Sequence, residues 1–309
     1  DFCLSRGLGD VYKRQGRHYA RKPMGNREFP SRVAKPVTTR HVMMMVLPPS
    51  SKPASNGTVR AERTRPGRHS RAPPLSAAMP CDTAFRIVAG RYLRDLTARH
   101  EATCGGDAGG LHEMRIALTR LRTAIAFFSP MVIGPQQTRL ADELKWLNAH
   151  LGTVRDLDVA IERLKELKPR PRAHYRSWRR ERAETQRLLT RTLRSLRYRR
   201  LVKSISHWIE RGSWSTKRGT QAAGQRACPV AEYSARKLMR WQEKLIKRSR
   251  RLEEISTEKR HRVRLKNKRL SYAIEFVAEL VSAGGISQLQ ATLKICLLYT
   301  SPSPRDRQK

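Results

Sequence analysis

The motif His-x-x-Arg occurs twice in the chain, in LHEMRIALTRLRTAIAFF (111–128) and in KRHRVRLKNKRLSYAIEFV (259–277). Imidazolium and guanidinium groups both donate hydrogen bonds to phosphate oxygens, so each motif suits anion binding. Counted from the two histidines, seven of seventeen positions are identical. The identical polar positions are His112/His261, Arg115/Arg264 and Arg120/Arg269. Because the repeat keeps charged as well as apolar residues, it predicts a duplicated binding surface.

Helical periodicity separates an apolar face from a basic stripe in both segments. In the first segment the apolar face contains Met114, Leu118, Leu121 and Ile125, and the opposite stripe contains His112, Arg115, Thr119 and Arg122. In the second segment the stripe is His261, Arg264 and Lys268. The first stripe spans about 15 Å at a rise of ~1.5 Å per residue. Two such stripes that face each other across a pseudo-two-fold axis would suit a linear polyanion.

The elements that must position these stripes all have helical apolar spacing, and no strand-like alternation is present. Helices are predicted over 83–100, 111–128, 136–152, 155–167, 174–211, 230–250 and 255–281, with Gly152 as a C-cap and a break at 212–225. The predicted fold class is therefore all-α, with two similar half-bundles at about 79–169 and 170–295.

The ends of the chain are expected to lie outside this fold. A DNA sequence that encodes residues 5–15 also encodes, on its opposite strand, CLLYTSPSPR (296–305). We therefore interpret 1–15 and 296–309 as adaptor-derived, with the second half truncated near 295. Residues 16–78 are rich in Pro, Arg and Ser without a period, which predicts a disordered basic segment or upstream read-through. The run HVMMMVL (41–47) is too short to span a membrane.

The charge of the chain predicts a polyanionic partner. The formal net charge is +39, and within 79–295 there are 46 Lys+Arg against 21 Asp+Glu. The positive charges of such a compact domain repel one another unless an anion binds, and inorganic polyphosphate, nucleic acid and an anionic membrane are the classes of partner that would serve.

Within 79–295 the cysteines are Cys81, Cys104 and Cys228, an odd number without CxxC spacing, which argues against a disulfide framework or zinc site. A reducing cytoplasm is the expected location.

Three segments together resemble the CHAD family, the histidine-containing α-helical domains. They are HEMRIALTRLR (112–122), the following leucine helix, and LGTVRDLDV (151–159), and the resemblance extends over about 83–294. It implies two pseudo-symmetric four-helix bundles around a basic cavity, the second one truncated here, and binding of inorganic polyphosphate. The binding positions that the resemblance carries over are His112, Arg115, Arg120, Arg122, Arg155, His261, Arg264, Lys268 and Arg269. Thr119 and Ser271 stand where arginine is common in the family, so two phosphate contacts are missing.

Other functions and other roles for these residues remain open at this stage. The chain could be a general nucleic-acid-binding helical protein, or an accessory domain of a triphosphatase-type enzyme, although no ExExK motif and no glycine-rich phosphate loop occur. We expect no catalytic residue, no metal site, no cofactor and no membrane partner, with polyphosphate granules as one location. Asp156 is expected to stabilise a helix start, and Asp158 to hold an arginine in place rather than a metal. The arginine-rich run 177–200 is either a solvated face with a leucine core stripe or part of the basic groove.

Overall fold

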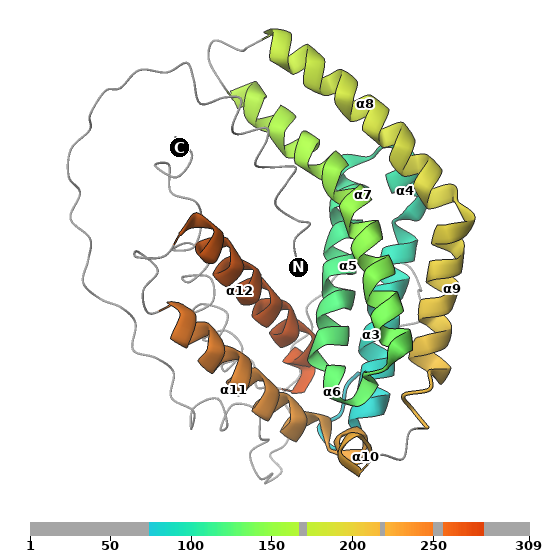
Figure 1. Cartoon of the computed structure of the whole chain (residues 1–309), viewed down its shortest axis with the longest axis vertical. Helices are drawn as coiled ribbons and strands as arrows, with labels where there is room; N and C mark the ends of the chain where they lie inside the picture. Colours follow the sequence, from blue (N-terminus) through green and yellow to red (C-terminus); the bar gives the residue numbers. More distant parts are fainter. Residues whose placement is uncertain (1–73, 167–171, 217–219, 250–255, 281–309) are drawn as a thin grey trace, which may run out of the picture.

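A computed structural model describes residues 74–166, 172–216, 220–249 and 256–280, and all secondary structure in them is helical apart from one isolated bridge between Pro80 and Pro229 (Figure 1). The helices are α3 (Cys81–Ala98), α4 (His100–Cys104), α5 (Ala108–Phe127), α6 (Ser129–Val132), α7 (Pro135–Glu166), α8 (Arg172–Arg194), α9 (Leu196–Arg211), α10 (Thr220–Ala227), α11 (Val230–Ser249) and α12 (Thr257–Val277), with a final 3-10 turn at Ala278–Leu280. The all-α prediction is confirmed. The segments 1–15 and 296–309, and residues 16–73 of the expected disordered segment, lie outside the described residues.

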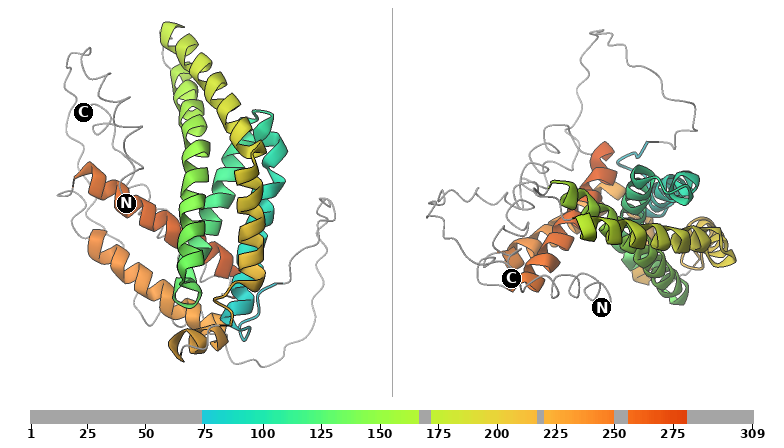
Figure 2. Two further views of the ribbon diagram at one scale, coloured as in Figure 1. Left: turned by 45° about the vertical axis from the view of Figure 1, so that its right-hand side comes forward. Right: turned by 90° about the horizontal axis from the view of Figure 1, so that it is seen from above.

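The helices form one upright bundle with a hairpin on its side. Helices α3, α5, α7 and α9 run alongside one another, and α8 continues upward along the far end of α7 (Figure 1). Helices α11 and α12 pack against each other as a hairpin, and α12 reaches α5 with its C-terminal part while its N-terminal end diverges from the bundle (Figures 1 and 2). Two pseudo-symmetric four-helix bundles stay a prediction.

Aromatic side chains join the bundle to the hairpin. Phe85 on α3 meets Trp214, which follows α9, with ring centroids 5.2 Å apart. Phe127 on α5 meets Phe276 on α12 at 5.1 Å, and both rings are buried. Edge-to-face pairs of this kind add about 0.5–1.5 kcal/mol each beyond the burial of their apolar area. The repeat helices therefore meet through their apolar ends, which fixes the position of the basic stripes.

Two of the predicted helix boundaries are wrong. Helix α7 runs without interruption from Pro135 to Glu166, so Gly152 lies inside it and is not a C-cap. The long basic helix predicted at 174–211 is instead two helices, because the Ser195 side chain accepts from the Tyr198 N–H and starts α9. Of the leucines in this basic run, Leu189 and Leu193 are buried, whereas Leu188 and Leu196 are 54% and 60% exposed. Helix α10 (Thr220–Ala227) also begins inside the expected break at 212–225 and extends past its end.

The packed region begins a few residues before Met79. Leu75 is buried, and its N–H donates to Glu279 Oε2 at 2.7 Å. Glu279 Oε1 also pairs with Arg91 Nη1 at 3.0 Å. The expectation was that the whole of 16–78 lies apart from the helical body. The structure differs at its C-terminal end, because residues 74–78 form hydrogen bonds with the last turn after α12 and with the start of α11.

Candidate functional site

The N-terminal half of α5 carries His112 and Arg115, and a local cap fixes where this helix starts. The Asp107 carboxylate accepts from the N–H groups of Gly109 and Gly110 at 3.0 and 2.8 Å, and these bonds hold the Asp107 pKa below its usual range. A side chain at position 110 would come within 2.8 Å of the Ala102 Cβ, so the close approach of α4 requires glycine there. The sequence DAGG therefore begins α5 directly against α4.

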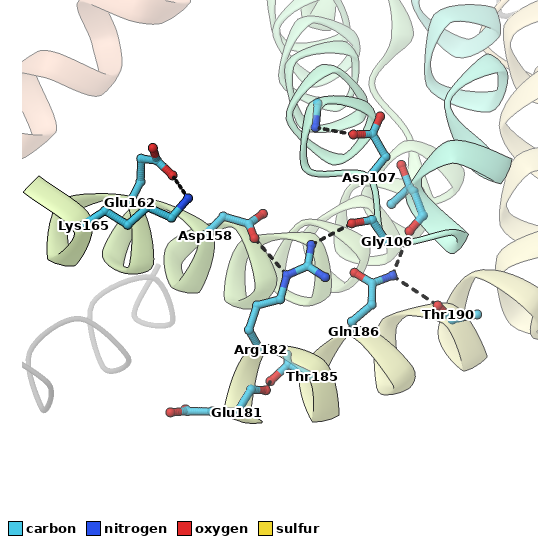
Figure 3. A network of polar contacts seen from close by, with 12 residues as sticks. Gly106, Asp107, Asp158, Glu162, Lys165, Glu181, Arg182, Thr185, Gln186 and Thr190 are labelled. Carbon is cyan, nitrogen blue, oxygen red and sulfur yellow. Dashed lines mark hydrogen bonds and ion pairs between the residues drawn. The ribbon is translucent and has the colours of Figure 1, made fainter. Parts of the chain in front are cut away.

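An arginine of α8 holds this start in place from outside (Figure 3). Arg182 Nε donates to Asp158 Oδ1 and its Nη2 donates to the Gly106 carbonyl, both at 2.9 Å. Gln186, one turn further along α8, donates to the Thr103 carbonyl at 2.8 Å. The interpretation of Asp158 as the holder of an arginine is confirmed, and the bonds link α7, α8 and the loop before α5.

Arg115 points from α5 toward α7. Its Nη1 donates to the Gly152 carbonyl at 3.4 Å and lies 3.6 Å from Asp156 Oδ1. Asp156 was expected at a helix start, but α7 is continuous there, so its carboxylate instead lies beside Arg115 on the outside of the bundle. The Arg115 side chain is 28% exposed, so it is partly removed from water and still reachable by a ligand.

Cations from three helices act on one another around Arg115. Partial desolvation lowers the pKa of His112, and Arg155 on α7 and Arg115 lower it further, with a smaller contribution from Lys268 on α12. Burial lowers the pKa of Lys268, and Arg264 and Arg115 also lower it. Such shifts arise where positive charges are close together and incompletely compensated. We call His112, Arg115, Arg155, Arg264 and Lys268 the basic cluster.

His261 lies at the outer end of this arrangement. Desolvation lowers its pKa first, followed by Arg264 and Lys268, which both belong to its own helix. The N-terminal end of α12, the end that carries His261, diverges from α5 (Figure 1). The repeat is thus matched in sequence, and Lys268 is the residue of the second stripe that acts on both His112 and Arg115 of the first stripe.

Two other predicted site arginines lie further along α5. Arg122 has a pKa lowered by burial and then by Arg269 of α12, so these two guanidinium groups are also neighbours of like charge. Arg120 instead donates through Nε and Nη2 to Glu275 Oε2, at 3.0 and 2.7 Å. Arg120 therefore already has a carboxylate and connects α5 to α12.

A further basic group was not singled out from the sequence. Lys237, Arg240 and Lys244 occur at spacings of three and four along α11, and burial followed by the two neighbouring cations lowers the Lys237 pKa. The spacing was visible in the sequence, but no second copy marked it as functional.

The described residues contain no group of three His, Cys, Asp or Glu side chains placed to hold a metal ion. Within the same residues, no helix has the length and apolar character needed to cross a bilayer. What the geometry offers is a set of neighbouring cationic donors on three helices, chiefly guanidinium groups, that can share the oxygens of a multiply charged anion.

Comparison with known families identifies the fold. The family model of the CHAD domain matches residues 87–295. The chain belongs to the CHAD domain family. The crystal structure of the CHAD domain from the plant Ricinus communis is also similar, with 25% sequence identity and a TM-score of 0.62 over 77% of this chain and 78% of that one. A comparison with curated proteins found no match. The family match contains all nine binding positions expected from the sequence.

Proposed function

We propose that this CHAD domain binds inorganic polyphosphate through the basic cluster, without catalysing a reaction. The observation that supports the proposal most is that cations from α5, α7 and α12 lie close enough to His112 to lower its pKa beyond the effect of its partial burial. Positive groups on three separate helices destabilise one another in the absence of an anion, and a chain of phosphates relieves that repulsion along its length. Arg122 and Arg269 continue the positive charge further along α5 and α12.

The cluster favours a linear polyanion over a single phosphate. Arg115 and Arg155 belong to different helices, and Lys268 belongs to a third, so the donors are distributed along a surface rather than gathered around one point. The nine proposed ligand-binding residues contribute unequally, because Arg120 is already engaged by Glu275. We expect the strongest contacts from Arg115, Arg155 and Lys268.

The test is equilibrium binding of long-chain polyphosphate to the full chain at several salt concentrations, with DNA and RNA as competitors. Each phosphate that pairs with a cation releases a counterion, so affinity should fall steeply with salt. A triple variant, Arg115→Ala, Arg155→Ala and Lys268→Ala, should lose most of the polyphosphate affinity. If DNA or RNA displaces polyphosphate at equal phosphate concentration and the triple variant binds as the wild type does, the proposal is wrong.

Nucleic-acid binding is the second candidate, and one observation favours it. Helices α8 and α9 lie on the side of α7 away from α12 (Figure 2), and their exposed residues include Arg180, Arg187, Arg191, Arg199 and Arg200. Such a face would serve the backbone of any nucleic acid. If this candidate is right, replacement of these five arginines by alanine should abolish RNA binding, while the triple variant of the basic cluster should leave it intact.

The absence of catalysis is part of the proposal and is tested separately. Incubation of the full chain with polyphosphate and Mg²⁺ should release no orthophosphate above the level without protein. We also propose a cytoplasmic location at polyphosphate granules. A fluorescent fusion should coincide with the granules in cells that contain them, and the fusion of the triple variant should be diffuse.

A further inference from the structure

Two cysteines far apart in the sequence lie directly opposite each other where α3 and α11 begin. Pro80 and Pro229 form an antiparallel bridge, and the Cys81 N–H donates to the Cys228 carbonyl at 3.1 Å. On the other side of the bridge, the Val230 N–H donates to the Met79 carbonyl at 2.8 Å. Prolines have no N–H, so they occupy the pair without hydrogen bonds, and Cys81 and Cys228 form the next pair.

This pairing suits a covalent bond between the two sulfurs. The hydrogen bond from the Cys81 N–H to the Cys228 carbonyl brings the two backbones close together at these residues. Disulfides join residues whose Cα atoms are roughly 4.4–6.8 Å apart, so the backbone need not move far.

The two thiols have different surroundings. Cys81 is fully buried, and burial together with the neighbouring Cys228 raises its pKa to about 12. Cys228 is partly exposed, and its sulfur accepts from Arg236 Nη2 at 3.2 Å. Its thiol is also 3.7 Å from Glu232 Oε2, and Glu232 pairs with Arg236. Cys228 is the more exposed of the two thiols and has a guanidinium donor at its sulfur, so we expect it to meet an oxidant first.

We propose that Cys81 and Cys228 are a redox modification site that a hydroperoxide converts to a reversible disulfide. The Cys228 thiolate attacks the peroxide, so that an S–O bond forms, the O–O bond breaks and an alcohol or water leaves after protonation. The sulfur of Cys81 then attacks the Cys228 sulfenic acid. The S–S bond forms, the S–O bond breaks, and the Cys81 proton leaves with the hydroxide as water. The pair loses two electrons, the peroxide gains two, and a dithiol reductant reverses the change.

The disulfide would attach the hairpin to the bundle. Cys81 is the first residue of α3, and Cys228 lies just before α11, which packs on the helix that carries Lys268 and Arg264. In the reduced protein, backbone hydrogen bonds and side-chain packing hold these two helix starts together without a covalent link. Oxidation should therefore raise the temperature at which the hairpin and the bundle separate, and a dithiol should lower it again.

The first test is treatment of the reduced full chain with hydrogen peroxide, followed by thiol blocking and digestion without reductant. The expected product is a peptide pair linked through Cys81 and Cys228, with two thiols lost per chain. Cys104 is the internal control, because it is also buried and lies on α4. If Cys228 is oxidised beyond the sulfenic acid while Cys81 stays free, or if either cysteine pairs instead with Cys104, the proposal is overturned.

The second test separates the two chemical steps. In Cys81→Ser the sulfenic acid of Cys228 has no partner, so dimedone should label Cys228 far more strongly than in the wild type. Arg236→Leu should slow the oxidation of Cys228 several-fold, whereas Arg240→Leu, one turn further along α11, should not change the rate. Equal dimedone labelling in the wild type and Cys81→Ser, or equal rates for the two arginine variants, would contradict the assigned roles.

Discussion

Replacement of Arg115 by alanine removes the central donor of the basic cluster, and the cost can be worked out from its contacts. A charge-assisted hydrogen bond to a phosphate oxygen contributes about 1.5–3 kcal/mol when the groups are partly desolvated. The Arg115 side chain is 28% exposed and fits that description. In the unliganded protein it also lies 3.6 Å from Asp156, which is 54% exposed, so this pair is screened and contributes no more than about 0.5 kcal/mol.

The difference, about 1–2.5 kcal/mol, corresponds to a loss of polyphosphate affinity between about 5-fold and 60-fold, since ~1.4 kcal/mol is a factor of ten. The assay is isothermal titration calorimetry at fixed ionic strength, with circular dichroism to verify that the helices are retained. Arg120→Ala is the matched control, because it removes the same charge from the same helix. Its Nε and Nη2 are already bound to Glu275, so its loss of affinity should stay below about 3-fold.

Equal losses in the two variants would refute the reasoning. They would show that polyphosphate responds to the total charge of α5 and not to the groups around Arg115. An unchanged affinity in Arg115→Ala, with full helicity, would show equally clearly that the basic cluster is a solvated surface. Nucleic-acid binding through α8 and α9 would then become the better proposal.

Three further changes have defined outcomes. The pKa values of His112 and His261 are lowered in the unliganded protein, and a bound polyanion should favour protonation of both side chains. Calorimetry should therefore show that the affinity for polyphosphate rises as the pH falls from about 7.5 to about 5.5. Replacement of both histidines by glutamine should flatten this trend. Without ligand, the unfolded chain takes up protons at these histidines more readily than the folded protein does. The free energy of unfolding should therefore fall once the pH drops below about 6.5, and a free energy of unfolding that does not change in acid would contradict the lowered pKa values. Arg182→Ala leaves Asp158, 9% exposed, without its cation and should lower the free energy of unfolding in urea by about 3 kcal/mol; an unchanged midpoint would show that the pair is dispensable. Gly152→Ala should raise the melting temperature, because alanine favours the helix by about 0.5–1 kcal/mol and nothing lies within 4 Å of the added Cβ. A lower melting temperature would show that the added methyl group clashes with its surroundings.

Periodicity predicted most of the helices because their apolar faces are buried in the bundle. It failed where a turn signal and a helix compete. The Leu-Gly at 151–152 resembles a helix end, yet α7 continues because Leu151 and Val154 on either side of the glycine are fully buried. At Ser195 the leucine spacing continues across the helix boundary, so only the side-chain bond to the Tyr198 N–H reveals the break. A serine that caps a helix is difficult to distinguish from a serine on its surface without knowing the backbone direction.

The candidate site was predictable as a set of residues but not as an arrangement. The repeat identified His112 and Arg115 because duplication preserved their types, the polar stripe added Lys268, and the structure places the three near one another. It could not distinguish Arg120 from them, because the carboxylate of Glu275 reaches Arg120 only through the packing of α5 on α12. Sequence spacing fixes the face of a helix, whereas the partner across the interface depends on how two helices cross.

The hydrogen bond between the Leu75 N–H and Glu279 has a consequence for how the protein is made. Its two partners are 204 residues apart in the chain, and Glu279 also pairs with Arg91 on α3. At a synthesis rate of roughly 5–20 residues per second, Glu279 leaves the ribosome some 10–40 s after Leu75. Once they have been translated, α3 and α5 remain without α12 for most of that interval, and the ring of Phe127 has no Phe276 to cover it. The nascent domain therefore exposes apolar surface until almost all of it has been translated. A chaperone that binds apolar helices can act on it throughout that time.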